Sequence, residues 1–174
     1  LVVDLDSQAS ASVSLGVARG DLAPSLHDVL FRSVPAARAI RLTATERVDL
    51  ITASADLMHA DVELAPLRNR EAKLRDALQP VASGYDWVLL DCPPSFNTLA
   101  QCALIASDQF IVPAIPHFLA FDGIQPLLAC SPLGIVDHQR AKGRRHTHQC
   151  RFCCVIPGHV GLGIDALIGI VLVL

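Results

Sequence analysis

The sequence lacks the usual glycine-rich loop that holds the phosphates of a nucleotide. No Gly-x-x-x-x-Gly-Lys-Ser/Thr segment occurs in its 174 residues. It also has few charged residues, which make up 18% of the chain and leave a formal net charge of −3. Overall charge therefore does not indicate a nucleic-acid binder. The first residues form neither a basic segment nor a cleavage site, so no signal peptide is expected.

The cysteines do not form the framework of a small secreted protein. Of the six, three lie in ordinary apolar segments, which is typical of a reducing compartment. We therefore expect a cytoplasmic protein. Because the first residue is Leu1 rather than Met, we also expect the chain to be truncated at its front.

Short apolar runs alternate with helical patterns along most of the chain. Hydrophobic residues make up 52% of the sequence, enough for one sizeable core. Strands alternating with helices predict a mostly parallel sheet with helical crossovers. We expect strands at 1–6, 48–52, 87–91 and 109–112, and helices at 24–30, 55–67, 68–78, 98–106 and from 123. Pro80 and Gly84 are expected to end the helix at 68–78.

Two of these strands finish in acidic residues. Asp4 and Asp6 close the first strand, and Asp91 closes the run that begins at Trp87. Ligands of open α/β sheets bind at the carboxyl edge of the strands. Asp4 and Asp6 are two residues apart, so they share one face. Carboxylates brought together at that edge predict a site for Mg²⁺ and phosphate.

Five segments, in order, resemble one family. Val3–Ser10 is similar to a "VDLDPQxN" motif, and Tyr85–Ser95 closely matches "YDxVLIDCPPS". Three further stretches at 51–57, 97–104 and 112–123 resemble "LPASxDL", "LTLNAL" and "VPVxxEYxALEG". Together they resemble the ParA/MinD-type ATPases with a deviant Walker A loop, in the ParA/Soj branch. The resemblance implies an α/β P-loop NTPase-like fold with helices on both faces of the sheet, incomplete here without the first strand and P-loop.

The resemblance covers residues 1–130, which we expect to form a partial ATPase domain. Ser7 replaces the family's usual proline, and His117 stands where glutamate is common. Residues 131–174 stay unassigned, as a frameshift, a rearranged frame or an insertion, although 168–172 faintly resembles the family's next strand.

The resemblance assigns roles to the acidic edge. Asp91 would hold Mg²⁺ directly or through a water, and Asp6 would orient the attacking water. Asp4 would hold either the water shell of Mg²⁺ or the switch loop. Pro93 and Ser95 would belong to a stiff loop that contacts nucleotide and senses the γ-phosphate.

The resemblance also implies cofactors and partners: ATP, Mg²⁺, a homodimer that encloses nucleotide, non-specific DNA on the nucleoid and a ParB-like stimulating protein. The task would be chromosome or plasmid partitioning. Without a phosphate loop, we expect these 174 residues not to hydrolyse ATP at a useful rate. The alternatives are a MinD-like or cellulose-synthesis-associated positioning ATPase, and a non-catalytic remnant. Gln8 is a weaker candidate for a contact across the dimer.

The last part of the sequence offers two weaker signals. Five histidines and cysteines crowd into 146–154, but a structural zinc site normally needs a second, separated pair. Residues 155–174 are about long enough to span a bilayer, but Asp165 disfavours this. We therefore expect neither a specific metal site nor stable membrane insertion.

Overall fold

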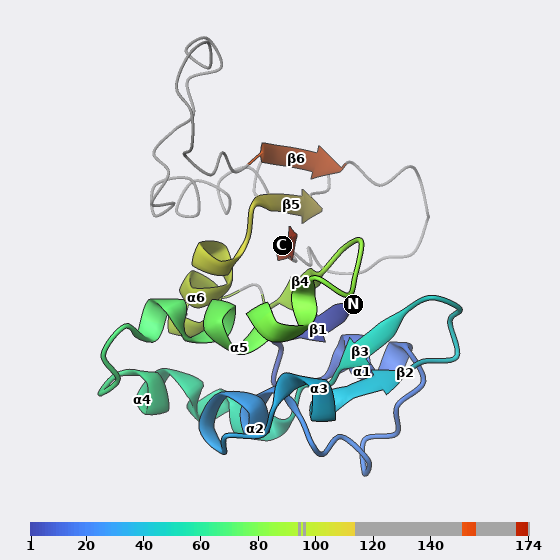
Figure 1. Ribbon diagram of the computed structural model, residues 1–174, viewed down its shortest axis with the longest axis horizontal. Helices are drawn as coiled ribbons and strands as arrows, with labels where there is room; N and C mark the ends of the chain where they lie inside the picture. Colours follow the sequence, from blue (N-terminus) through green and yellow to red (C-terminus); the bar gives the residue numbers. More distant parts are fainter. Residues whose placement is uncertain (94, 96, 114–150, 156–169, 174) are drawn as a thin grey trace, which may run out of the picture.

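The computed structural model describes residues 1–93, 95, 97–113, 151–155 and 170–173. Seven strands form one sheet, and most of the helices gather beside it (Figure 1). The strands are β1 Val2–Asp4, β2 Ile40–Leu42, β3 Asp49–Ile51, β4 Leu89–Cys92, β5 Gln109–Pro113, β6 Arg151–Val155 and β7 Ile170–Val173. The helices are α1 Ser10–Ser14, α2 Leu26–Phe31, α3 Ala36–Ala39, α4 Ala60–Leu64, α5 Lys73–Ala82 and α6 Thr98–Ala106, with short 3₁₀ turns η1 Ala55–His59 and η2 Arg70–Ala72.

The sheet is mostly parallel, as predicted. Its order is β2-β3-β1-β4-β7-β5-β6. Strand β1 pairs in parallel with β3 and β4, and β5 pairs in parallel with β6. Strand β7 is antiparallel to both β4 and β5, so β4 and β5 run in the same direction. Only β2 and β7, among the described strands, run against the others. The predicted strand near 168–172 therefore exists, but in the opposite direction to its neighbours.

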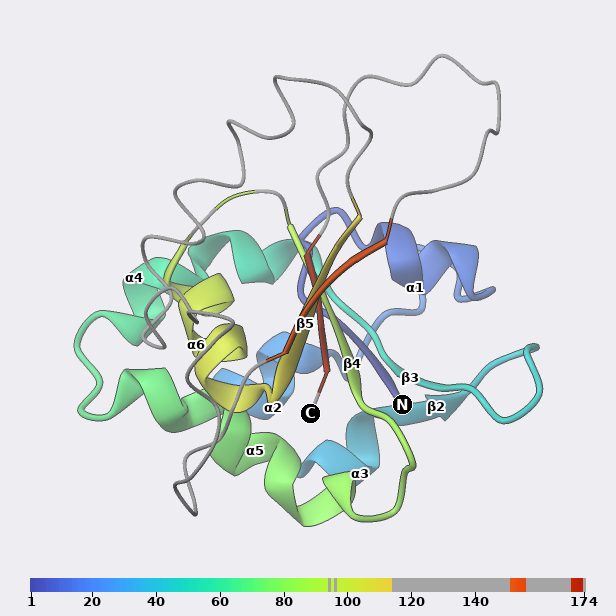
Figure 2. The ribbon, with the colours of Figure 1, turned by 90° about the horizontal axis from the view of Figure 1, so that it is seen from above.

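The helices divide into a main layer and one separate helix. Contacts link α5 with α6, α3 and α2, and α6 with α4. Helix α1 lies behind β3 in Figure 1 and across the strands from α5 in Figure 2. Helical segments therefore lie on both sides of the sheet, with the larger layer on the α5 side.

The apolar pattern of the sequence fills the space between this layer and the sheet. Strands β1, β3 and β4 contribute Val3, Leu50 and Leu90, which are fully buried. Helix α5 contributes the side chains of Leu74 and Leu78, which are also fully buried. Burial of such side chains is the main favourable contribution to folding.

Local signals at two helix starts explain their bounds. In α2, Ser25 and Asp28 form a capping box, in which the Ser25 N–H donates to Asp28 Oδ2 at 2.7 Å. Pro24 therefore precedes the helix rather than lying in its first turn. In α6, the Asn97 side chain accepts a hydrogen bond from the Ala100 N–H at 2.8 Å. The predicted bounds of α6 are confirmed.

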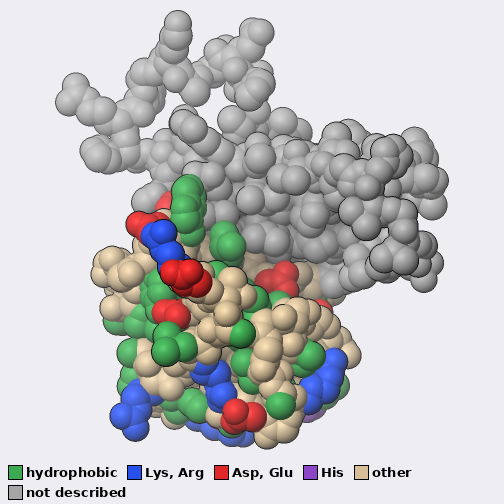
Figure 3. Space-filling model, turned by 90° about the vertical axis from the view of Figure 1, so that its right-hand side faces the viewer, with side chains coloured by type: hydrophobic (Ala, Val, Ile, Leu, Met, Phe, Trp, Pro, Cys, Tyr) green, Lys and Arg blue, Asp and Glu red, His purple; other side chains and the backbone are tan. Residues whose placement is uncertain are grey.

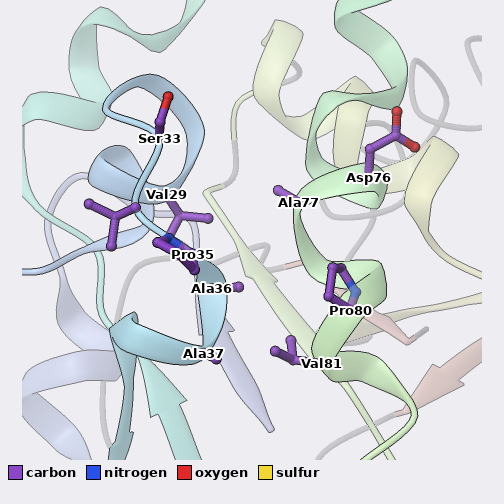
Figure 4. Close-up of a pocket in the computed structure, with 10 residues that line it drawn as sticks. Val29, Ser33, Pro35, Ala36, Ala37, Asp76, Ala77, Pro80 and Val81 are labelled. Atoms are coloured by element: carbon purple, nitrogen blue, oxygen red, sulfur yellow. The ribbon is translucent and has the colours of Figure 1, made fainter.

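The prediction that Pro80 ends its helix is wrong. Helix α5 begins later than expected, at Lys73, and continues through Pro80 to Ala82. Proline removes one backbone donor, but Val81 and Ala82 still pack against the core and hold the last turn. Pro80 and Val81 line an apolar groove with Pro35 and Ala36 (Figure 4). None of the predicted site residues lines this groove.

The visible surface mixes charge signs. Lys and Arg side chains lie among Asp and Glu side chains on the described part of the face in Figure 3. Several large apolar side chains are also exposed, including Leu42, Val62 and Trp87. No helix among the described residues is long and apolar enough to cross a membrane. Several sequence predictions concern positions outside the described residues: His117, the helix from 123, Asp165 and most of the His/Cys cluster.

Candidate functional site

Two of the predicted acids are direct neighbours across paired strands. Parallel pairing of β1 and β4 places Asp4 opposite Asp91. The ladder continues one residue further, because the Leu5 N–H donates to the Asp91 carbonyl at 2.8 Å. Residues in register on adjacent strands present their side chains to the same face, at a spacing of about 5 Å. The sheet therefore brings Asp4 and Asp91 together at the carboxyl edge, as predicted.

Asp4 is fully buried and holds the loop that follows β1. Its Oδ1 accepts the Asp6 N–H at 3.1 Å. Its Oδ2 accepts both the N–H and the hydroxyl of Ser12, at 2.8 and 2.7 Å. Burial raises the pKa of the Asp4 carboxyl, and the hydrogen bonds from Ser12 and Asp6 oppose that rise. Asp4 therefore holds the loop after β1 in place, whereas its predicted roles toward the water shell of Mg²⁺ or the switch loop stay predictions.

Asp6 lies in that loop, half-buried, two residues beyond β1. Its Oδ1 accepts the Gln8 N–H at 3.0 Å, and its carbonyl accepts the Ala9 N–H at 2.8 Å. These bonds form a tight turn in which Ala9 takes a left-handed conformation, with φ of 53°. Gln8 is exposed, and its carbonyl accepts a bond from Arg19 at 2.9 Å. One oxygen of Asp6 is engaged by the turn, which orients its carboxylate.

Asp91 differs from Asp4 because its carboxylate accepts no hydrogen bond within the described part of the chain. None of the described residues donates a hydrogen bond to it, although it is half-buried. Burial, together with the nearby negative charges of Asp4 and Asp6, raises the pKa of the Asp91 carboxyl to about 6. A group of this kind gains most from a cation, which would offset both effects. Of the three predicted acids, Asp91 therefore has the carboxylate that a cation would stabilise most, and its binding of Mg²⁺ stays a prediction.

The carboxylates at this edge fit a Mg²⁺ ion that takes most of its ligands from water and from a nucleotide. The described residues contain no group of three or more His, Cys, Asp or Glu side chains placed to enclose a metal. Mg²⁺ keeps several waters and often takes only one or two carboxylates from the protein. An oxygen of Asp91, bonded directly or through a water, satisfies that requirement.

The loop after β4 begins at the same edge. Pro93 is half-buried, and Ser95 is an exposed bend residue; residues 94 and 96 lie outside the description. At the other end of this loop, α6 begins at Thr98, whose N–H donates to Oδ1 of Asp61 on α4 at 2.9 Å. The far end of the loop is thereby tied to the helical layer. Whether Pro93 and Ser95 contact nucleotide stays a prediction.

Sequence reasoning missed Ser12 and Asp61. Ser12 stands in a run of small residues where Ser10, Ser12 and Ser14 alternate, and nothing in that pattern marks one as buried. Asp61 reads as an ordinary exposed acid on an amphipathic helix. Only the fold brings them beside β1 and α6.

Comparison with known proteins identifies the class. An AAA domain family model matches residues 1–135, which is more than half of the chain. The chain therefore belongs to the AAA domain family. Its curated relatives include the sporulation initiation inhibitor protein Soj of Bacillus subtilis, 36% identical over 128 residues, covering 74% of this chain and 51% of Soj. The chromosome partitioning protein ParA of Caulobacter vibrioides is 38% identical over 130 residues, covering 74% and 49%.

Within that family the chain is of the ParA/Soj type, as its motifs predicted. It spans about half the length of the curated relatives it matches. A solved cobyrinic acid a,c-diamide synthase from Mycobacterium smegmatis, with bound ADP and magnesium, is 31% identical with a TM-score of 0.65. That match covers 75% of this chain and 56% of the synthase. McdA from Cyanothece, at 24% identity and a TM-score of 0.69, matches 74% of this chain and 51% of its own length and supports the fold.

Proposed function

We propose that this chain supplies the magnesium-binding edge of a ParA-type partition ATPase. The observation that carries the proposal is the juxtaposition of Asp4 and Asp91 on paired strands, with Asp6 in the adjoining loop. Asp4 is engaged by the protein, whereas Asp91 is available to a cation. This division of work suits a site where one carboxylate binds Mg²⁺ and another holds the surrounding loop.

In this proposal Asp91 holds Mg²⁺ directly or through a water. When bound, the ion neutralises charge on the phosphates of ATP. Asp6, fixed by its turn, orients the attacking water and helps to accept its proton. Pro93 and Ser95 begin the loop that responds to the γ-phosphate. Ordering of that loop would be passed to α4 through the bond between Asp61 and Thr98.

The wider function follows from the family and goes beyond the described residues. We propose that the protein forms a nucleotide-dependent homodimer, binds DNA non-specifically and is stimulated by a ParB-like partner, in the cytoplasm at the nucleoid. Relatives named for chromosome partitioning support this task. The mixed surface charge gives no separate support for DNA binding.

Binding of Mg²⁺ and nucleotide to the 174-residue chain tests the proposal. Isothermal titration with Mg²⁺, with ATP and with both together should give heat that depends on Mg²⁺ for the wild type. Asp91→Asn should lose the heat that depends on Mg²⁺. Asp86→Asn is the matched control, because Asp86 is exposed and lies before the amino end of the same strand. Since these residues contain no Gly-Lys loop, we expect weak nucleotide binding and no useful hydrolysis.

Two outcomes would count against the proposal. Equal Mg²⁺ binding by the wild type and Asp91→Asn would move the metal site elsewhere. A complete absence of Mg²⁺ and nucleotide binding would favour the non-catalytic alternative.

A further inference from the structure

Ser12 connects three parts of the fold through one buried hydroxyl. Its side chain is fully buried. The hydroxyl donates to Asp4 Oδ2 at 2.7 Å and accepts the Ala53 N–H at 3.1 Å. It therefore joins the end of β1, helix α1 and the segment that follows β3. One bond joins a hydroxyl to a carboxylate and the other joins a backbone N–H to that hydroxyl, and both distances are ordinary for hydrogen bonds.

The same carboxylate that binds Ser12 also binds the loop of Asp6. Asp4 uses Oδ2 for Ser12 and Oδ1 for the Asp6 N–H. Rotation of the Asp4 carboxylate would break bonds on both sides at once. The Ser12 hydroxyl, together with the Ser12 N–H that donates to the same Oδ2 at 2.8 Å, therefore fixes the carboxylate whose Oδ1 holds Asp6. Ala53 adds a second constraint, because its buried N–H would lose its only acceptor among the described residues if the hydroxyl were removed.

We propose that Ser12 is a positioning residue for Asp6. It acts through Asp4, and it sets the loop of Asp6 against the segment after β3. The importance of Ser12 for nucleotide chemistry rests on the function proposed above. The effect of Ser12 on the position of the Asp6 loop is independent of that function. Buried, fully satisfied polar networks of this kind favour a single arrangement of the groups they join.

Amide hydrogen exchange measured by NMR tests the hold directly. Ser12→Ala removes the hydroxyl, and Ser12→Cys nearly keeps the volume while replacing it with a weak donor and acceptor. In both variants the Asp6 and Ala53 amides should exchange about tenfold faster, which corresponds to one ordinary hydrogen bond. The Leu78 amide in the middle of α5 should be unchanged. Ser12→Thr, which retains a hydroxyl, should restore slow exchange, and exposed Ser14→Ala should match the wild type.

The second measurement concerns the site. Ser12→Ala should weaken binding of Mg²⁺ and ATP, and Ser12→Thr should recover it. Unchanged exchange at Asp6 would overturn the inference. Equal acceleration at Asp6 and Leu78 would also overturn it, because that pattern reports only a loss of global stability. If wild-type protein binds neither Mg²⁺ nor ATP, the proposed function fails, while the exchange pattern still decides whether Ser12 holds the loop.

Discussion

Replacing Asp91 by asparagine should make the protein more stable at neutral pH. The carboxylate is half-buried beside two other acids, and its pKa is raised from 3.8 to about 6. Each pKa unit corresponds to about 1.4 kcal/mol, so the shift has an upper bound of about 3 kcal/mol. Partial exposure to solvent reduces that value, and we expect Asp91→Asn to gain about 1–2 kcal/mol at pH 7.5.

The gain should depend on pH in a defined direction. Below pH 3.8 the Asp91 carboxyl is protonated in both the folded and the unfolded chain, and it contributes no difference. Between pH 3.8 and about 6 the folded chain retains a proton that the unfolded chain has lost, so stability falls as pH rises. Above about 6 the loss is complete. The stability difference between variant and wild type should therefore be largest at neutral pH and close to zero at pH 3.8.

Urea unfolding followed by circular dichroism, at pH 7.5 and pH 4, measures this difference. Asp86→Asn is the control and should stay within about 0.5 kcal/mol of the wild type at both values. Millimolar Mg²⁺ should raise the free energy of unfolding of the wild type and leave that of Asp91→Asn unchanged. The stability difference between the two proteins should therefore become smaller. A variant less stable than the wild type at pH 7.5, or a difference that is the same at both pH values, would refute the reasoning.

Three other predictions follow from contacts outside the acidic edge. Tyr85, the single tyrosine, should titrate near pH 12 by ultraviolet absorbance, because burial and its hydrogen bond to Asp49 raise the pKa to about 12; Asp49→Asn should lower that value, and an unchanged curve would contradict the bond. Leu74→Ala removes a fully buried side chain and should cost about 2–5 kcal/mol in urea unfolding, so a loss under about 1 kcal/mol would count against its burial. Asn97→Ala should cost about 1 kcal/mol, while Asn97→Asp, which keeps an acceptor for the Ala100 N–H, should cost less.

Most elements were predictable from the sequence because their local signals agree with their packing. Helix α6 follows a capping asparagine with an apolar run, and its predicted bounds are confirmed. The strand predicted at 87–91 is also present, although β4 begins at Leu89 and ends at Cys92. The extension of α5 through Pro80 was not predictable, since contacts of Val81 with the core decide it. The direction of β7 was equally hidden, because an apolar run does not record which way its strand will run.

The sequence predicted which acids lie at the carboxyl edge of the sheet, but not which of them the protein itself engages in hydrogen bonds. The strand endings placed Asp4 and Asp91 at one edge, and register confirms their juxtaposition. Which of them is engaged by the protein depends on Ser12, eight residues beyond Asp4 and indistinguishable in sequence from its serine neighbours. The roles of all five predicted site residues stay predictions: Asp4, Asp6, Asp91, Pro93 and Ser95.

The position of β7 in the sheet affects how the chain folds while it is being synthesised. Strands β4 and β5 are linked by α6 yet do not pair with each other, and the gap between them is filled by residues 170–173. During translation, both strands are complete long before β7 exists, so each has an edge of unpaired N–H and C=O groups. Such edges pair readily with other chains. Slow translation should therefore promote aggregation of nascent chains, and a chaperone that shields strand edges should raise the yield of folded protein.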